Sequence, residues 1–231
     1  MTISAATWIA DSMVTQAVFE RWPDYRAILI ATDHVDVTDL VAIARDLLKE
    51  AHAVARDSAA SAAHPHVDVW HQAYRDFGVK PRVARASVDA LLRRAAGESG
   101  LPSISPLVDL YNAVSMINGV PIGGEDLDRY AGPARLVLAA GNEEFTTRAN
   151  GEPATEHPDA GEPVWVDGRG VTCRRWNWRQ TIRTAIADDT TRVGFIIDSL
   201  DAPDHTGAQA AASQLVALLP GSIVRQLDRP E

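Results

Sequence analysis

The chain has 231 residues, 46% of them hydrophobic, and a single cysteine, Cys173. A chain of this length buries a substantial core without disulfides or a structural metal, and one thiol excludes an intramolecular disulfide. No apolar run reaches the ~18 residues of a membrane-spanning helix. Residues 1–13 carry no cationic segment ahead of their apolar stretch, so we expect a cytoplasmic protein without a membrane partner. The net charge of −9 argues against DNA as a partner, because proteins that wrap a long nucleic-acid backbone carry a basic face, but it is compatible with contact to one RNA end.

The first part of the chain predicts a buried strand followed by two helices. Residues 25–32 form a short aliphatic and β-branched run typical of a core strand. Apolar residues then follow the helical period over 37–61, which predicts a long amphipathic helix. A second helix is expected over 67–77, ended by Gly78 in a left-handed conformation.

Serines mark the starts of two further helices. The hydroxyl of Ser87 is expected to cap a helix that closes at Gly97, and Ser105 before Pro106 predicts the start of a helix over 106–118. The second of these helices has an apolar face and a more polar one. The apolar face is predicted to contain Leu107, Leu110, Tyr111, Val114 and Ile117, and the other face Asp109, Asn112 and Met116.

The second half of the chain predicts mostly strands. A short helix is expected around 126–130, and 134–140 reads as a strand that 144–148 continues in the same sheet. An Asn150-Gly151 turn is expected to lead into a surface loop up to residue 163. The remaining predicted elements are a hairpin about Asp167-Gly168, a buried strand over 193–199, a helix over 209–219 and a strand over 222–227 that pairs with 193–199.

These elements predict an α/β (α+β) fold with a mixed β-sheet flanked by helices. No internal repeat and no long linker divides the sequence, so we expect one domain over residues 1–231. Within it, residues 1–86 supply an N-terminal strand and helices, and residues 199–231 supply a C-terminal helix and strand.

No metal and no cofactor is expected. Four side chains of metal-binding types lie close together in the sequence: His64, His66, Asp68 and His71. No cysteine is nearby to complete a zinc site, so we interpret them as a polar helix start. Residues 119–124 are rich in glycine but follow a helix, and thus lack the strand-to-helix setting of a dinucleotide-binding loop. Cys173 is expected to be a buried, unreactive thiol.

Residues 100–132 carry a recognisable pattern. It consists of a helix with Val108, Asp109 and Asn112, followed by a turn with Gly119, Pro121 and Asp126. This pattern resembles the B3/B4 editing domain in the β subunit of bacterial phenylalanyl-tRNA synthetase. The resemblance covers residues 87–198 and also rests on Leu92-Arg93-Arg94, residues 134–151, Asp167 and residues 191–198. It implies a B3/B4-like interleaved domain.

The resemblance also implies a function. In that family the editing domain hydrolyses tyrosine wrongly esterified to phenylalanine tRNA, in a pocket between two interleaved halves. The chain is too short to hold the synthetase's catalytic modules. The expected function is therefore a freestanding aminoacyl-tRNA deacylase that acts in trans on the aminoacylated 3′ end of tRNA and is functionally linked to an aminoacyl-tRNA synthetase.

The pocket positions depart from the family pattern. Gly123 stands where the family has histidine, and Tyr111 stands where it has threonine. Tryptophans and an asparagine at 176–178 fall near its glycine pair, and Asp198 matches the acid that reads the tyrosine hydroxyl. These departures imply an acyl group other than tyrosine.

The resulting site predictions fall into three sets. Backbone N–H groups near Gly123 and Gly124 are predicted to stabilise the oxyanion, while Glu125, Asp126 or Asp198 orients water or holds the substrate ammonium. Substrate contacts are predicted for Tyr111, Asn112, Asp126, Trp176, Asn177 and Trp178. Because arginine suits phosphates and stacked bases, tRNA contacts are predicted for Arg82, Arg85, Arg93, Arg94, Arg174, Arg175 and Arg179.

Each set has an alternative interpretation. Asp109 and Asn112 are equally the kind of residues that tie down a loop, and Asp126 is the kind that caps a helix. Trp176 and Trp178 lie two positions apart on a predicted strand and so share one of its faces, which suits core packing as well as a stacking wall. The arginines suit ordinary surface ion pairs. Two other functions stay open: a non-catalytic module that binds tRNA or an amino-acid-like ligand, and an enzyme acting on a small ester or amide.

Overall fold

A computed structural model describes residues 3–60, 65–80, 82–149, 151–200 and 202–229. Its helices are α1 (Ala5–Asp11), α2 (Gln16–Arg21), α3 (Val37–Ala60), α4 (Pro65–Asp76), α5 (Ser87–Ala96), α6 (Pro106–Asn118) and α7 (Thr206–Leu218). Its strands are β1 (Met13–Val14), β2 (Arg26–Thr32), β3 (Ile122–Asp126), β4 (Arg135–Leu138), β5 (Phe145–Ala149), β6 (Glu152–Glu156), β7 (Pro163–Asp167), β8 (Gly170–Arg174), β9 (Arg179–Gln180), β10 (Val193–Ser199) and β11 (Ile223–Leu227). The predicted mixed α+β class is confirmed. Within the described ranges, no helix has both the length and the apolar character needed to cross a membrane.

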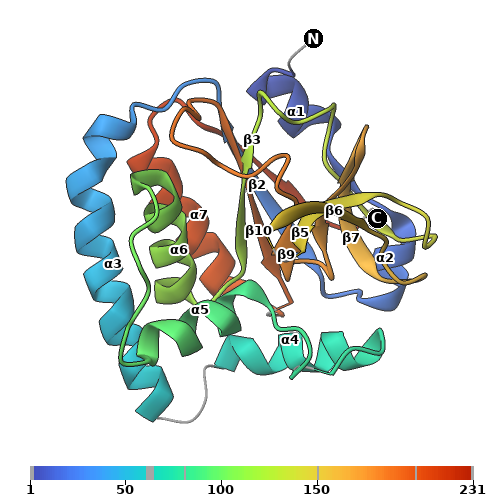
Figure 1. Ribbon diagram of the computed structural model, residues 1–231, viewed down its shortest axis with the longest axis horizontal. Coiled ribbons are helices and arrows are strands. Elements are labelled where there is room, and N and C mark those ends of the chain that lie inside the picture. The colour runs from blue at the N-terminus through green and yellow to red at the C-terminus, as the bar shows by residue number, and fades with distance from the viewer. Residues whose placement is uncertain (1–2, 61–64, 81, 150, 201, 230–231) are drawn as a thin grey trace.

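A four-stranded antiparallel sheet forms the centre of the molecule, in the order β11-β2-β10-β3. Side chains alternate along β2, so that Ile28 and Ile30 enter one buried cluster while Ala27 and Leu29 enter another. Helices α3, α6 and α7 cover the first of these faces (Figure 1). Both faces of β2 are therefore buried, which explains its continuous apolar sequence.

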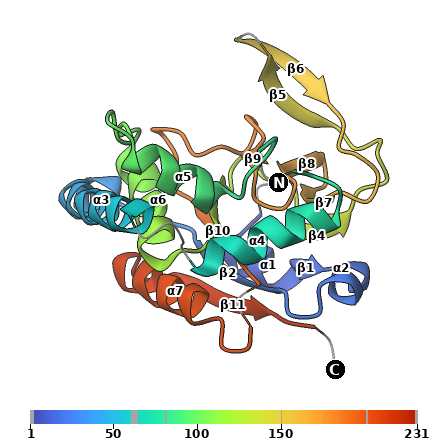
Figure 2. The same cartoon turned by 90° about the horizontal axis from the view of Figure 1, so that it is seen from below.

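A second sheet, in the order β1-β4-β7-β8-β9, lies on the other side of the central sheet. The cluster between them includes the fully buried Trp8, Trp165 and Trp176, together with residues from α1, α2, α4 and α5. Strands β5 and β6 pair only with each other and form an arm that projects from the body (Figure 2). Segments from both ends of the chain thus contribute to one buried cluster.

Several predicted elements are wrong in their pairing. Residues 144–148 do not continue the sheet, because β5 pairs with β6, which occupies part of the predicted loop. Strand β11 pairs with β2 rather than with β10, because β10 is already flanked by β2 and β3. Asn150 lies outside the described residues, although Gly151 has the positive φ of 86° that a turn requires. Ser61, the predicted end of the long helix, also lies outside them.

Other corrections concern local conformation. Residues 123–126 belong to strand β3 rather than to a turn, and a turn replaces the helix expected around 126–130. Ser87 is the first residue of α5 and Ala86 is its N-cap, so the predicted serine cap is wrong there. Ser105 does cap α6, through the N–H of Val108. Helix α6 is buried on most sides, since Met116 is fully buried and Asp109 is only 5% exposed.

Candidate functional site

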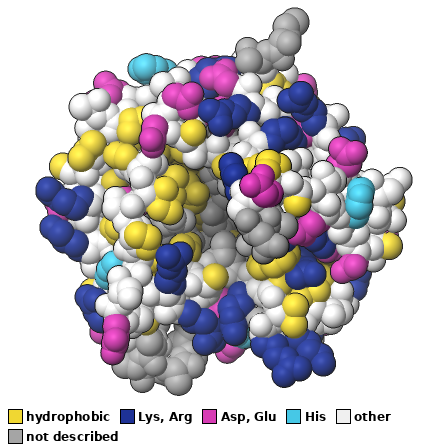
Figure 3. Space-filling model, viewed as in Figure 1, with side chains coloured by type: hydrophobic (Ala, Val, Ile, Leu, Met, Phe, Trp, Pro, Cys, Tyr) yellow, Lys and Arg dark blue, Asp and Glu magenta, His cyan; other side chains and the backbone are white. Residues whose placement is uncertain are grey.

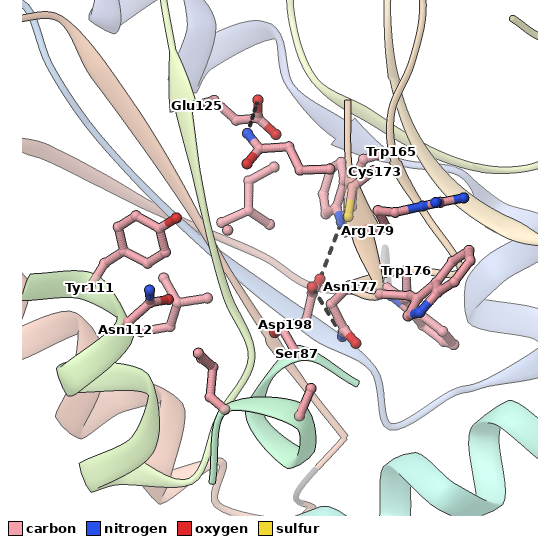
Figure 4. A pocket seen from close by; sticks show the side chains of 17 residues that line it. Ser87, Tyr111, Asn112, Glu125, Trp165, Cys173, Trp176, Asn177, Arg179 and Asp198 are labelled. Carbon is pink, nitrogen blue, oxygen red and sulfur yellow. Dashed lines mark hydrogen bonds between the residues drawn. The ribbon is translucent and has the colours of Figure 1, made fainter. Parts of the chain in front are cut away.

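A cavity of about 260 Å³ lies where α5, α6 and β3 face the end of β8, the turn after it, and β9. Figure 3, which has the viewpoint of Figure 1, shows a hollow near the centre of this face of the molecule. The residues that line the cavity are Ser87, Ala90, Leu91, Tyr111, Asn112, Ile122, Gly123, Glu125, Trp165, Cys173, Trp176, Asn177, Trp178, Arg179, Gln180, Ile196 and Asp198. Most of these side chains are apolar or neutral, and the acidic side chains of the lining are Glu125 and Asp198 (Figure 4).

The cavity brings together most of the predicted catalytic and substrate-binding residues, although they come from separate parts of the chain. Sheet register explains part of this. Gly123 pairs with Ile196 and Glu125 pairs with Gly194, and directly paired residues direct their side chains to the same face of a sheet. Asp198 lies two residues beyond Ile196 on that face. The predicted residues Gly124 and Asp126, at the alternate positions of β3, do not line the cavity.

Glu125 is a buried acid on the cavity wall, only 2% exposed. Its Oε2 accepts a hydrogen bond of 2.8 Å from Nε2 of Gln180, which also donates to the carbonyl oxygen of Gly124. Burial raises the pKa of the Glu125 carboxyl group to about 8. At neutral pH this group is therefore mainly protonated and able to donate a hydrogen bond.

Asp198 is equally buried, at 2% exposure, but has more hydrogen-bond donors. Its Oδ1 accepts from the hydroxyl of Tyr25 at 2.5 Å and from Nε1 of Trp165 at 3.3 Å, and its Oδ2 accepts from Nδ2 of Asn177 at 3.3 Å. Burial raises the pKa of Asp198 to about 7 in spite of these donors. All three donors are neutral, so the charge of this carboxylate is stabilised by hydrogen bonds alone.

The two glycines of β3 differ in their surroundings. A Cβ atom at Gly123 would meet no atom within 4 Å, so this position leaves open space in the cavity. A Cβ atom at Gly124 would lie 2.7 Å from Cδ1 of Ile186 and 2.9 Å from the ring of Tyr111. Gly123 therefore enlarges the cavity, whereas Gly124 allows close packing beside it.

The predicted oxyanion donors are not found at these glycines. At one end of the β3–β10 pairing the N–H of Asp198 donates to the carbonyl oxygen of Pro121, and at the other end the N–H of Leu127 donates to the carbonyl oxygen of Arg192. In an antiparallel ladder every second residue exchanges hydrogen bonds with its partner strand, and Gly123 lies two positions after Pro121. The N–H of Gly123 therefore points at β10 and is used within the sheet. Gly124 does not line the cavity, which removes the second predicted donor.

Tyr111 and Asn112 point from α6 into the cavity (Figure 4). The ring of Tyr111 packs against Phe195, with centroids 5.8 Å apart, and burial raises the pKa of its hydroxyl above the ordinary value. Asp109 does not line the cavity and instead accepts hydrogen bonds from Ser103 and from the N–H of Ile104. The alternative role of tying down a loop is therefore correct for Asp109.

The two tryptophans of the turn after β8 have different environments. Trp176 is fully buried and packs against Trp22, Tyr25 and Trp70, so core packing accounts for most of its surface. Trp178 is partly exposed, and the guanidinium groups of Arg175 and Arg179 lie 4.3 and 4.5 Å from the centre of its ring. The predicted strand alternation is wrong here, because Arg175 and Trp176 adopt positive φ angles of 47° and 67° in a turn.

Asp126, a predicted substrate contact, instead stabilises the turn after β3. Its Oδ1 accepts from the N–H of Asp128, its Oδ2 accepts from the hydroxyl of Thr190, and Arg129 forms an ion pair with it at 3.2 Å. Asp126 does not line the cavity, so the structure lends no support to the prediction that it contacts the substrate. The alternative interpretation, a helix cap, is wrong, because a turn and not a helix follows Asp126.

Most of the arginines predicted to bind tRNA already have acidic partners. Arg85 and Arg93 pair with Asp89. Arg174 and Arg179 both pair with Glu156. Arg174 also pairs with Glu162, as does Arg175. Arg82 and Arg94 are exposed, and no ion pair within the described part of the chain involves them. The interpretation as ordinary ion pairs therefore holds for five of the seven arginines, and Arg82 and Arg94 are the best placed to contact phosphates.

The histidine cluster does not form a metal site in the described residues. Nε2 of His71 lies 2.8 Å from Oδ2 of Asp89, and Nδ1 of His71 lies 3.6 Å from Oδ1 of Asp68. His64 and the side chain of His66 lie outside the described residues. Among those that are described, no three histidine, cysteine or acidic side chains are placed to hold a metal ion.

Three polar residues of the cavity were not predicted as site residues. Gln180 fixes Glu125, Ser87 has a buried hydroxyl oxygen without a hydrogen-bond partner, and Cys173 lies on the cavity wall with a pKa that burial raises. The sequence offers no signal for Gln180, because its partner lies 55 positions earlier. Its role depends on the packing of β9 against β3.

Comparison with known proteins identifies the chain's relatives. The sequence profile of the B3/4 domain matches residues 69–215, which contain the whole segment 87–198 of the sequence resemblance. The chain is similar to an N-terminal fragment of the phenylalanyl-tRNA synthetase β-subunit from Pyrococcus horikoshii, with 13% identity and a TM-score of 0.43. That alignment covers 95% of this chain and 54% of the fragment, so the chain spans about half its length. No curated protein sequence matches.

Proposed function

The chain belongs to the B3/4 domain family, and from this membership we propose that its cavity holds the acyl group of an aminoacyl-tRNA whose ester bond the protein hydrolyses. The observation that supports this proposal most directly is the 260 Å³ cavity, whose wall carries two buried carboxyl groups, Glu125 and Asp198. We further propose that residues 1–231 act as one domain, in trans, on a tRNA charged by a separate synthetase.

The reaction requires little side-chain chemistry. An aminoacyl ester is already activated, so water attacks its carbonyl carbon, the bond to the ribose oxygen breaks, and the ribose hydroxyl receives a proton. We assign to Glu125 and Asp198 the roles of accepting a proton from that water or holding the acyl group, and their position in the cavity wall and their pKa values near neutral pH support this assignment. Tyr111, Asn112 and Trp178 supply the remaining contacts to the acyl group.

Editing explains why such a protein is useful. A synthetase pocket separates side chains that differ by one methylene group by only about 10–200-fold, so a second, hydrolytic site improves fidelity. The open space at Gly123, where the family has histidine, and Tyr111, where it has threonine, make this cavity different from the family's tyrosine pocket. An acyl group other than tyrosine is therefore the proposed substrate.

A panel of tRNAs carrying incorrect amino acids tests the proposal. We expect the purified protein to release at least one amino acid well above the rate in buffer, and Glu125→Gln or Asp198→Asn to lower that rate. Glu144→Gln, an exposed acid outside the cavity, is the matched control. Ester hydrolysis at the buffer rate across the whole panel contradicts the proposal.

The second candidate function is a binding module without catalysis. Two observations favour it: glycine replaces the family's histidine at position 123, and five of the seven candidate arginines are neutralised by acids. Binding of tRNA that weakens as salt increases, without release of the amino acid, would support this function.

A further inference from the structure

The buried acids among the described residues differ in their partners. Outside the cavity, Asp109 accepts hydrogen bonds from Ser103 and from the N–H of Ile104. The four others outside the cavity form ion pairs: Asp89 with Arg93, Asp126 with Arg129, Glu162 with Arg174 and Asp167 with Arg183. The two that line the cavity, Glu125 and Asp198, form no ion pair among the described residues, and Arg179, the arginine of the lining, pairs instead with Glu156. A buried carboxylate is costly without a cationic partner, so each of these two groups depends on hydrogen bonds, on a bound proton or on a cationic ligand.

Asp198 needs no cation from outside the protein. Its two oxygens receive three hydrogen bonds from neutral donors, on Tyr25, Trp165 and Asn177. Carboxylates are stabilised by two or three such donors without a counter-ion. Glu125 has fewer donors, because the side-chain groups that stabilise its carboxyl group are the amide of Gln180 and the hydroxyl of Thr184.

We propose that Glu125 forms an ammonium-binding subsite, so that the acyl group held in this cavity carries an amine that reaches the Glu125 carboxylate. The proposal rests on the proposed function only in taking the ligand to be an acyl group. An ammonium group would supply the positive charge that Asp89, Asp126, Glu162 and Asp167 receive from arginine side chains. Charge-assisted hydrogen bonds of this kind are the strong ones in a desolvated site.

The rest of the cavity suits the carbon chain that carries the amine. Leu91, Ile122 and Ile196 provide apolar walls, and Gly123 leaves the space in front of β3 open. The volume of about 260 Å³ exceeds the ~150 Å³ cavity that accepts benzene in an engineered protein, so an aliphatic amino acid fits. The amine is either the α-amine of the acyl group or one at the end of its side chain, and both have the same chemistry.

Four amides with the same six-carbon chain separate these two sources. Lysinamide has both amines, norleucinamide has only the α-amine, 6-aminohexanamide has only the terminal amine, and hexanamide has none. Titration calorimetry with the whole protein, without tRNA, gives their affinities. We expect at least one single-amine compound to bind about tenfold or more tightly than hexanamide, the gain typical of a hydrogen bond to a charged group. The tighter of the two single-amine compounds identifies the source.

Substitution at Glu125 assigns the effect to this residue. Glu125→Gln keeps the shape of the side chain but removes its charge, so we expect it to abolish the preference for amines, while the control Glu144→Gln retains it. Three outcomes overturn the proposal: hexanamide binds as well as the amines, the Glu125→Gln protein keeps the preference, or none of the four compounds binds at millimolar concentration. If Glu125→Gln does not fold, the comparison of the four compounds on the unmodified protein decides.

This test is independent of the deacylation assay. Amine-selective binding without hydrolysis of any aminoacyl-tRNA would support the subsite and contradict the proposed catalysis. Hydrolysis without any preference for amines would support the catalysis and contradict the subsite.

Discussion

The hydroxyl oxygen of Tyr25 lies 2.5 Å from Oδ1 of Asp198, at the wall of the cavity. Tyr25 directly precedes β2, and Asp198 lies on the neighbouring strand β10. Both side chains are almost completely buried, at 0% and 2% exposure. This contact explains how one residue outside the cavity lining helps to hold a cavity acid in place.

Tyr25→Phe should destabilise the protein by about 1–3 kcal/mol, because it removes a hydrogen-bond donor from a buried carboxyl group. Urea denaturation followed by circular dichroism measures the change in the free energy of unfolding. Tyr130→Phe is the matched control, since the hydroxyl of Tyr130 pairs with the neutral hydroxyl of Thr172 at 3.1 Å. An equal or smaller loss for Tyr25→Phe than for Tyr130→Phe would show that the contact with Asp198 has no special weight.

Alanine at the two glycines of β3 should have opposite consequences. Gly123→Ala should leave the melting temperature nearly unchanged, because the added methyl group enters open space. Gly124→Ala should cost about 1–3 kcal/mol, because the methyl group would overlap Ile186 and Tyr111 in a packed region. Thermal denaturation of both variants checks this, and a larger loss at Gly123 would contradict the position of the cavity.

Stability should fall as the pH rises from about 5 to about 8. Burial raises the pKa values of Asp198 and Glu125 to about 7 and about 8, whereas the ordinary values are 3.8 and 4.5. The folded protein therefore keeps protons that the unfolded chain releases, and the stabilisation present below the unfolded pKa values is lost as pH rises through the folded ones. Acids with lowered pKa values, such as Asp33 and Asp89, act at lower pH, outside this window.

Denaturation curves at several pH values measure this effect. The Glu125→Gln protein, which cannot titrate at this position, should show a smaller decline between pH 5 and pH 8 than the unmodified protein. Parallel curves for the two proteins would mean that Glu125 does not bind a proton more tightly in the folded state.

The exposed arginines should determine the salt dependence of tRNA binding. If tRNA binds as proposed, Arg82→Gln and Arg94→Gln should each weaken binding and reduce the slope of log K against log salt by up to about one unit, as expected for loss of a phosphate contact. Arg45→Gln, an exposed arginine on α3, is the control. Filter binding at several salt concentrations checks this, and unchanged slopes in both variants would place the tRNA elsewhere.

Local sequence signals predicted the elements better than their pairing. The apolar run of β2 and the Ser105-Pro106 start of α6 were predicted correctly, because hydrophobic periodicity and capping depend on neighbouring residues. The partner of β11 was wrong, because strand order depends on contacts that are distant in the chain. No element was predicted before residue 25, where α1 and α2 are only 7 and 6 residues long and gain stability from packing of Trp8 and Phe19.

The candidate site shows the same division. The family resemblance directed attention to Tyr111, Gly123, Glu125 and Asp198, all of which line one cavity. It did not reveal that Gln180 fixes Glu125 or that Tyr25 donates to Asp198, because these contacts join strands far apart in the sequence. Trp176 was ambiguous, since only the folded chain shows that its ring packs against three other aromatic side chains.

The most direct test of the proposed function is the rate of amino-acid release from a panel of mischarged tRNAs, measured for the unmodified protein and for Gly123→Leu. Leucine at this position would extend from a Cβ site with no atom within 4 Å and would occupy space in the cavity. We predict that the unmodified protein hydrolyses at least one ester tenfold or more above the buffer rate and that Gly123→Leu loses most of this activity while still binding tRNA. Release at the buffer rate for every ester, or hydrolysis that Gly123→Leu leaves unchanged, would contradict a catalytic role for this cavity.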